Sequence, residues 1–301
     1  MQAILETIHT IGLVPVIALD DAAQAVPLAQ ALTAGGIPAA EVTFRTAAGE
    51  EAIRRIARDC PEVLVGAGTI LNIEQCRRAV DAGARFIVSP GYNEELVAYC
   101  LENGIPVLPG CANASDMTRA VNAGLEAVKF FPAGQAGGLP AIRALAPVFP
   151  GLRFMPTGGV NTGNMGEYLK DERILACGGT WMVKKELIAA GAWEEITRLS
   201  REAVETMLGL SLRRVILAGA AGAASCALTQ ALGGAGLEAG GDGTDGVIEV
   251  AAASVERAVY HLGRQGLSFD EAARETDGKG RTTSIGLCGR FGGFAVRLVR
   301  A

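Results

Sequence analysis

The chain has 301 residues, of which 50% are hydrophobic and 20% are charged, and its formal net charge is −5. So much apolar sequence forms a sizeable core and excludes wholesale disorder, while the length indicates one large domain or two. The mildly acidic balance argues against non-specific nucleic-acid binding, which depends on clustered Lys and Arg.

The number and spacing of cysteines and histidines limit the metal sites and disulfides that the chain can form. Seven cysteines are scattered without a CxxC pair, and His9 and His261 are the only histidines. This pattern fits neither a zinc site nor a secreted disulfide framework, so we predict no metal, reduced thiols and a cytoplasmic protein. The N-terminus, MQAILETIHT, lacks the positive start of a signal peptide. Residues 215–237 carry no charge, but their many Ala and Gly favour a strand and a small-residue helix over a membrane span.

The first part of the chain alternates between two kinds of segment. Short β-rich runs occur at 14–19, 39–44, 63–68, 85–89, 105–110, 126–132, 153–159 and 174–179. Most intervals hold an amphipathic stretch with helical spacing, as at 49–59, 72–83 and 93–104. Eight such units in series predict an α/β fold, a closed parallel (β/α)8 TIM barrel. An open doubly wound sheet is the alternative, but no GxGxxG opens the first unit and the regular repeats favour closure.

A boundary is expected at 208–213, because a helix over 201–214 ends near Gly209 and a new apolar run begins at Val215. We therefore divide the chain into a barrel, 1–210, and a small α+β domain, 211–301. The second part predicts a strand in RVILAG, a helix at 220–232, a strand at 246–251 and a helix at 255–266. Three further strands follow in 267–275, 281–289 and 292–300, with a hairpin signal in DGKG at 277–280. This order suggests a β-α-β-β-β unit.

Reactive residues of a (β/α)8 barrel lie at the carboxyl ends of its strands. Lys129 is the one lysine inside an apolar strand, EAVKFFP. Alternation puts it on one face with Ala127 and Phe131, and puts Val128 and Phe130 toward the helices, so Lys129 is expected in the barrel interior. Burial favours a neutral amine, which can attack a carbonyl. A lysine paired structurally with an acid, or turned to solvent, is the alternative.

The second strand, EVTFRT, adds charged groups. Alternation places Glu41, Thr43 and Arg45 on one inward face. A buried carboxylate and guanidinium must pair with each other or meet a ligand. Glu41 is therefore a candidate for proton transfer and Arg45 for a two-pronged clamp on a carboxylate. A structural Glu–Arg pair stays possible.

Three strand ends are rich in glycine. Thr69 ends GAGT, where two glycines let the backbone approach a ligand closely. The seventh and eighth ends read MPTGGV (155–160) and CGGTW (177–181), and paired glycines before a turn expose backbone N–H groups that cradle phosphate in many barrels. An interior lysine, a carboxylate, an arginine and a phosphate cradle together describe a Schiff-base enzyme acting on a phosphorylated oxo-acid.

Residues 1–207 resemble the family of 2-keto-3-deoxy-6-phosphogluconate (KDPG) and 2-keto-4-hydroxyglutarate (KHG) aldolases of the Entner–Doudoroff pathway. The motifs EVTFRT, VGAGT, SPG (89–91), VKFFPA, PTGG and GGTW follow one another in the family's order. The resemblance implies a class I aldolase that reversibly cleaves KDPG to pyruvate and glyceraldehyde 3-phosphate, or 4-hydroxy-2-oxoglutarate to pyruvate and glyoxylate. It also implies no cofactor, a small oxo-acid as substrate and a homotrimer.

The resemblance also assigns roles to residues. Lys129 forms the Schiff base, Glu41 shuttles protons, and Arg45 and Thr69 hold the pyruvyl carboxylate. The other substrate-binding residues that it implies are Pro90, Phe131, Thr157, Gly158, Gly159, Gly179 and Thr180, the last five around the distal hydroxyls and phosphate. Departures from the family pattern are Gly134 in PAG instead of PAE, Thr180 instead of serine, and the sequence of 110–116. They bear on the choice of aldehyde and leave the lysine chemistry untouched.

Two other functions are weighed against the aldolase. A phosphate-binding barrel isomerase or epimerase would share the glycine pairs but would not need Lys129. A non-catalytic sugar-acid-binding protein would keep the pocket and use residues 211–301 as its output. These residues faintly resemble one glyoxalase-like module, whose metal ligands come from strands. Because His261 falls in a predicted helix, an accessory role in packing or oligomerisation is favoured over metal catalysis.

Overall fold

The computed structural model describes residues 1–217, 237–239 and 246–301. The chain divides into two compact units, Met1–Met207 and Leu208–Ala301. The predicted helix at 220–232 and most of the uncharged stretch lie outside the described residues. Among the residues described, no helix is long and apolar enough to cross a membrane.

The first unit is built on eight short parallel strands. They are β1 (Leu13–Ile17), β2 (Ala39–Thr43), β3 (Leu64–Gly68), β4 (Ile87–Val88), β5 (Val107–Leu108), β6 (Ala127–Phe130), β7 (Arg153–Pro156) and β8 (Cys177–Gly179). Six form a sheet in the order β5-β4-β3-β2-β1-β8, and β6 pairs with β7. Parallel bridges between Gly110 and Lys129 and between Thr157 and Gly178 join these two sets. The result is a (β/α)8-like barrel, in which neighbours in sequence are neighbours in space.

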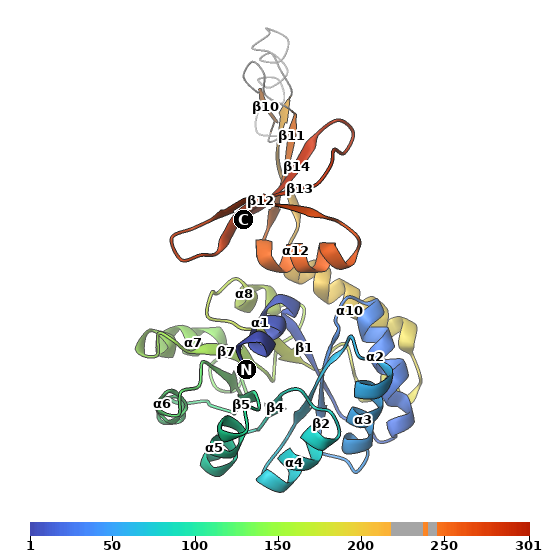
Figure 1. Cartoon of the computed structure of the whole chain (residues 1–301), viewed down its shortest axis with the longest axis vertical. Helices are drawn as coiled ribbons and strands as arrows, with labels where there is room; N and C mark the ends of the chain where they lie inside the picture. The colour runs from blue at the N-terminus through green and yellow to red at the C-terminus, as the bar shows by residue number, and fades with distance from the viewer. Residues whose placement is uncertain (218–236, 240–245) are drawn as a thin grey trace. The chain divides into compact units, whose positions relative to one another are not determined.

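Helices surround the strands (Figure 1). They are α1 (Gln2–Ile11), α2 (Ala25–Ala34), α3 (Gly49–Asp59), α4 (Ile73–Asp81), α5 (Glu94–Glu102), α6 (Ala114–Asn122), α7 (Gly138–Leu145), α8 (Met165–Leu169), α9 (Lys185–Ala189) and α10 (Trp193–Leu208). Asn72, Asn93 and Asn113 cap α4, α5 and α6, each accepting a hydrogen bond from a backbone N–H in the first turn. Each such cap stabilises a helix start by about 1 kcal/mol.

The observed elements differ from the sequence prediction mainly at their ends. The apolar runs at 85–89 and 105–110 yield strands of only two residues, β4 and β5. Phe86, inside the first run, is fully buried yet lies outside the strand, because an apolar pattern reports burial rather than ladder pairing. The helix expected at 201–214 begins at Trp193 and ends at Leu208, before Gly209 with its φ of 53°.

In the described residues of the second unit, a sheet is accompanied by the helix α12. The elements of this unit are β9 (Ser211–Leu217), β10 (Leu237–Ala239), β11 (Val247–Ala252), α12 (Val255–Arg264), β12 (Phe269–Thr276), β13 (Thr282–Leu287) and β14 (Ala295–Arg300), in the sheet order β10-β9-β11-β14-β13-β12. β11 runs parallel to β14 and antiparallel to β9. His261 lies in α12, not in a strand.

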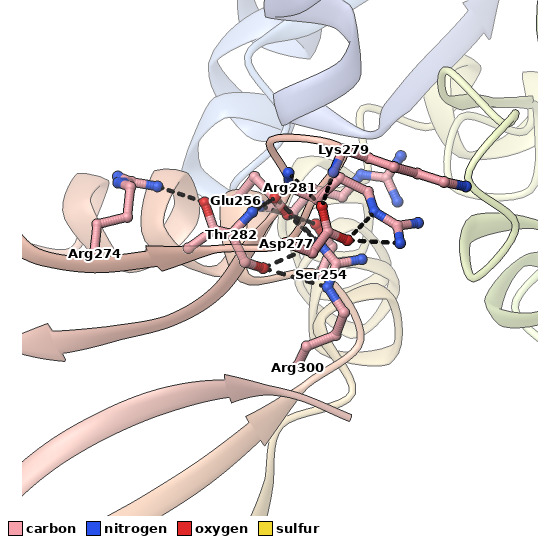
Figure 2. Close-up of polar contacts among 9 residues, drawn as sticks. Ser254, Glu256, Arg274, Asp277, Lys279, Arg281, Thr282 and Arg300 are labelled. Atoms are coloured by element: carbon pink, nitrogen blue, oxygen red, sulfur yellow. Dashed lines mark hydrogen bonds and ion pairs between the residues drawn. The ribbon is translucent and has the colours of Figure 1, made fainter.

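Polar contacts fasten α12 to this sheet (Figure 2). Glu256, in the first turn of the helix, accepts hydrogen bonds from the Thr282 backbone N–H at 2.6 Å and from Arg300 Nη2 at 3.1 Å. Asp277, in the turn between β12 and β13, accepts from the backbone N–H of Lys279 at 2.8 Å and from Arg281 Nε at 2.7 Å. The two carboxylates thus anchor one helix start and one hairpin turn.

Candidate active site

An amine and a carboxylate meet inside the barrel. Lys129 on β6 and Glu41 on β2 are only 4% and 0% exposed. Nζ of Lys129 lies 3.0 Å from Oε1 and 3.3 Å from Oε2 of Glu41. Because β2 and β6 are not neighbours in the barrel, the contact crosses its interior. The interior position expected for Lys129 is therefore present, and the alternative that it points to solvent is wrong.

The surroundings of Lys129 hold it rigidly. Its backbone N–H donates to the Pro109 carbonyl at 3.0 Å, and its carbonyl accepts from the Cys111 N–H at 2.8 Å. The ring centroid of Phe131 lies 5.4 Å from Nζ, close enough for a cation–π contact. A charged pair buried this deeply is tolerated only when its members hydrogen-bond each other well. The amine therefore lies between the Glu41 carboxylate and the Phe131 ring.

The position of Arg45 corrects the sequence prediction. Strand β2 ends at Thr43, so the alternation does not extend to Arg45, which is exposed. Its Nε donates to Thr69 Oγ1 at 3.2 Å, while Glu41 bonds Lys129, so the alternative of a structural Glu–Arg pair is wrong. The buried hydroxyl of Thr43 donates to the Ile17 carbonyl at 2.8 Å and ties β2 to β1.

Thr69, which accepts the Arg45 bond, has an unusual backbone. Its φ is 58°, in the left-handed region, where a β-branched residue is rare. Such strain persists only where the surrounding structure enforces it, and it gathers at functional sites. The Thr69 hydroxyl and the Arg45 guanidinium thus lie together just beyond the ends of β3 and β2.

The two glycine pairs come from neighbouring strands. Thr157, directly after β7, is bridged to Gly178 in β8, so 157–159 and 179–180 start side by side. Gly158 and Gly159 have φ of 90° and 83°, which only glycine adopts readily. The Gly134 N–H donates to the Gly158 carbonyl at 2.8 Å and joins the loop after β6 to this segment. The structure thus brings together the strand ends predicted to cradle a phosphate.

Sequence reasoning did not predict which side chains three glycines at strand ends make room for. A Cβ added at Gly68 would meet Glu41 Oε1 at 2.2 Å, one at Gly178 would meet Thr157 Oγ1 at 2.3 Å, and one at Gly110 would meet the Pro90 carbonyl oxygen at 2.0 Å. Each thus gives room to a predicted site residue. Each glycine lies near the end of a strand, beside the strand that carries the site residue or ends just before it. This relationship can be recognised only when the pairing of the strands is known.

Metal ligands do not gather in the part of the chain that is described: no group of three or more His, Cys, Asp or Glu side chains there could hold an ion. The polar groups at the strand ends are the Lys129–Glu41 pair, the Arg45–Thr69 pair and the loop at Thr157. A fixed amine beside a carboxylate can form an imine with a carbonyl and exchange protons with it.

Comparison with known proteins supports this chemistry. Residues 4–199 match a family model described as KDPG and KHG aldolase. A 2-dehydro-3-deoxy-phosphogluconate aldolase of Treponema pallidum is 46% identical over 205 residues, which are 68% of this chain and 98% of that protein. The KHG/KDPG aldolase of Escherichia coli K12 is 44% identical over 201 residues, 66% of this chain and 94% of its own.

Solved structures agree with the sequence matches. The KDPG aldolase of Legionella pneumophila, with pyruvate captured as a covalent carbinolamine intermediate, superposes with a TM-score of 0.64 at 38% identity and covers 66% of this chain and 97% of its own. The Zymomonas mobilis enzyme, solved with 3-phosphoglycerate, gives 0.62 at 40% identity and covers 66% of this chain and 94% of its own.

Proposed function

The chain belongs to the KDPG and KHG aldolase family, and on this basis we propose that it is a class I aldolase that reversibly cleaves KDPG to pyruvate and glyceraldehyde 3-phosphate. Cleavage of 4-hydroxy-2-oxoglutarate to pyruvate and glyoxylate follows the same chemistry. The observation that carries the proposal is the buried contact of 3.0 Å between Lys129 Nζ and Glu41 Oε1. It supplies a nucleophile and a proton carrier in one buried site.

Imine formation is the first step. The Lys129 amine attacks the C2 carbonyl of the substrate to give a carbinolamine, and Glu41 donates the proton with which its hydroxyl leaves as water. The product is a protonated imine at Lys129. Because the imine nitrogen is then positively charged, it can take up electrons through C2 when the bond between C3 and C4 breaks.

Cleavage and release follow. Glu41, now a carboxylate, takes the proton of the C4 hydroxyl, the C3–C4 bond breaks, and the aldehyde departs. The electron pair of that bond becomes the double bond of an enamine. A proton returned to C3 restores the imine, and water hydrolyses it to pyruvate and free Lys129. When water adds to the protonated imine, Glu41 takes back the proton that it donated in the first step, so the enzyme ends unchanged.

The remaining polar groups would orient the substrate. Arg45 and Thr69, held together at 3.2 Å, are proposed to bind the pyruvyl carboxylate, because a guanidinium matches a carboxylate in two parallel hydrogen bonds. Backbone and hydroxyl groups of Thr157, Gly158, Gly159, Gly179 and Thr180 are proposed to bind the distal hydroxyls and phosphate. Pro90 and Phe131 are proposed to contact the substrate between these two ends.

Borohydride trapping tests the proposal. The full chain is incubated with pyruvate and sodium borohydride and then weighed by mass spectrometry. Wild type and the matched control Lys170→Ala, at an exposed lysine, should each gain one reduced pyruvyl group, and Lys129→Ala should gain none. A wild type that gains nothing would contradict the Schiff base, and the isomerase or sugar-acid-binding alternatives would then stand.

The oligomeric state, the location in the cell and the role of residues 211–301 are proposed from the family resemblance and the free thiols. We propose a homotrimer, which light scattering tests directly. We propose a cytoplasmic site of action, supported by free thiols at Cys60, Cys76, Cys100, Cys111, Cys177 and Cys288. For residues 211–301 we propose an accessory role outside the catalytic step, because the family match ends at residue 199. Kinetics with and without residues 212–301 test that role.

A further inference from the structure

Gly68 lies against the carboxylate of the catalytic pair. It ends β3, next to β2, which carries Glu41. A Cβ placed on Gly68 would stand 2.2 Å from Oε1, 2.7 Å from Cγ and 2.8 Å from Cδ of Glu41. All three distances are far below van der Waals contact, so alanine at this position and the present Glu41 conformation exclude each other.

Backbone geometry does not require glycine here. The φ of Gly68 is outside the left-handed region, unlike that of Gly158 or Gly159, so alanine can adopt the same backbone. Lack of space is therefore the reason for the missing side chain.

The Glu41 side chain can move more easily than the backbone of β3. Gly68 is in register with Thr43 of β2, and its carbonyl accepts a hydrogen bond from the Phe44 N–H at 2.8 Å. Shifting Gly68 would break this ladder, whereas Glu41 can rotate about its side-chain bonds. An added methyl group would thus turn the carboxylate away from Lys129 while the barrel stays intact.

A second glycine on the same face of β3, Gly66, leaves space for the Phe86 ring. A Cβ at Gly66, two residues before Gly68, would lie 2.4 Å from the Phe86 ring. The inward face of β3 is thus bare at both positions, and side chains from other parts of the barrel fill the space: Phe86 at one level and Glu41 at the next. The two levels differ in chemistry, because one holds an apolar ring and the other holds the proton carrier.

We propose that Gly68 is a positioning residue. Because it has no side chain, the Glu41 carboxylate has the space to lie within proton-transfer reach of Lys129. This inference rests on the proposed function, in which Glu41 moves protons. It predicts that Gly68→Ala slows every proton transfer assigned to Glu41, including the loss of water from the carbinolamine. Lys129, whose backbone is bonded to Pro109 and Cys111, keeps its place and can still form the imine on longer incubation. Substrate affinity changes less, because Arg45 and Thr69 are untouched.

Deuterium exchange isolates the proton-transfer step. In heavy water, Glu41 removes a proton from C3 of the pyruvate imine, the C–H electron pair becomes the enamine double bond, and a deuteron then returns to C3. We expect Gly68→Ala to slow this exchange and kcat on the order of 10²-fold, the effect of misplacing a catalytic group by about 1 Å. The borohydride adduct should still form on Lys129. The matched control is Gly151→Ala, where no heavy atom lies within 4 Å of the added Cβ, and its rates should equal those of wild type.

A double-mutant cycle with Glu41→Ala identifies the clashing partner. Gly68→Ala should lower kcat and the melting temperature in the wild-type background and leave both unchanged when Glu41 is alanine. If Gly68→Ala fails to fold alone but folds with Glu41→Ala, the clash is with Glu41, as proposed. If both variants fail to fold, or if losses are equal in the two backgrounds, the inference is wrong.

The outcome also separates this inference from the proposed function. A wild type that forms no borohydride adduct removes the aldolase chemistry, whatever Gly68 does. A wild type that forms the adduct, together with a Gly68→Ala variant that keeps the wild-type exchange rate and kcat, overturns the positioning role alone.

Discussion

The Thr157 side chain occupies the space that a side chain at Gly178 would need. A Cβ on Gly178 would lie 2.3 Å from the Thr157 hydroxyl and 3.2 Å from its Cβ. Gly178→Ala should therefore displace this hydroxyl from the proposed phosphate site. We expect KM for KDPG to rise about tenfold, as for the loss of one hydrogen bond to a charged group, with a smaller rise for the unphosphorylated 4-hydroxy-2-oxoglutarate. Steady-state kinetics on both substrates measure the difference. Gly166→Ala, which meets no neighbour, is the control, and equal rises on both substrates would contradict the assignment.

Replacement of Glu41 by glutamine tests the proton carrier itself. The amide keeps the size of the side chain and can accept a hydrogen bond from Lys129, but it cannot carry a proton. We expect Glu41→Gln to lower kcat by about 10²–10⁴-fold, the range for a lost general acid–base. The trapped pyruvyl adduct should still appear after longer incubation. Glu62→Gln, at an exposed residue, serves as control, and a kcat at the wild-type level would exclude Glu41 from the mechanism.

The strained backbone at Thr69 predicts a trade between stability and binding. Its φ of 58° disfavours a β-branched residue, while asparagine tolerates this region. Thr69→Asn should raise stability by about 1 kcal/mol, the low end of the strain at such positions, and raise KM for the substrate. Thr69→Ser keeps the hydroxyl and should keep KM. Thermal unfolding and kinetics measure both quantities, and a Thr69→Asn variant less stable than wild type would refute the strain.

Thiol reactivity should follow burial. Burial raises the pKa of the Cys111 thiol to about 12, so little thiolate forms at pH 8. Cys288 in the second unit is exposed. We expect iodoacetamide to modify Cys288 much faster than Cys111 in the folded protein, and both equally in denaturant. Peptide mass spectrometry gives the two rates, and fast labelling of native Cys111 would contradict its enclosure.

The hairpin turn at Asp277 predicts a pH dependence. The hydrogen bond from Arg281 lowers the pKa of Asp277 to about 2, below the value of about 3.9 for an unfolded aspartate. A lowered pKa stabilises the fold above the unfolded value, and this contribution is lost as pH falls from about 4 to about 2. Asp277→Asn should therefore melt earlier than wild type at pH 7. The difference should shrink at pH 2.5, and a constant difference would be evidence against the linkage.

Sequence reasoning succeeded where a periodic pattern carried the information. Alternation within EAVKFFP and AAEVTF is a local property of a strand, and it placed Lys129 and Glu41 in one interior. It failed at Arg45, because the pattern does not reveal that β2 ends at Thr43. The ends of α3, α4, α5 and α12 were predicted closely, since caps and glycines mark them, whereas the helix predicted at 201–214 spans Trp193–Leu208.

The glycines could not be predicted from the sequence for a different reason. The need for Gly68 comes from Glu41 on a neighbouring strand, and the need for Gly178 comes from Thr157 on another. A missing side chain leaves no pattern of its own, and its purpose is visible only when the strands are paired in register. The same holds for the bond between Arg45 and Thr69, which joins the ends of two strands.

The separation of Lys129 from Glu41 along the chain has a consequence for how the protein is made. The two residues are 88 positions apart, so β2 with the acid is synthesised long before β6 with its basic partner. A lone carboxylate in an apolar interior is strongly destabilising. We therefore expect the first five strands not to form a compact half by themselves, because the sixth strand supplies the partner of Glu41 as well as part of the core.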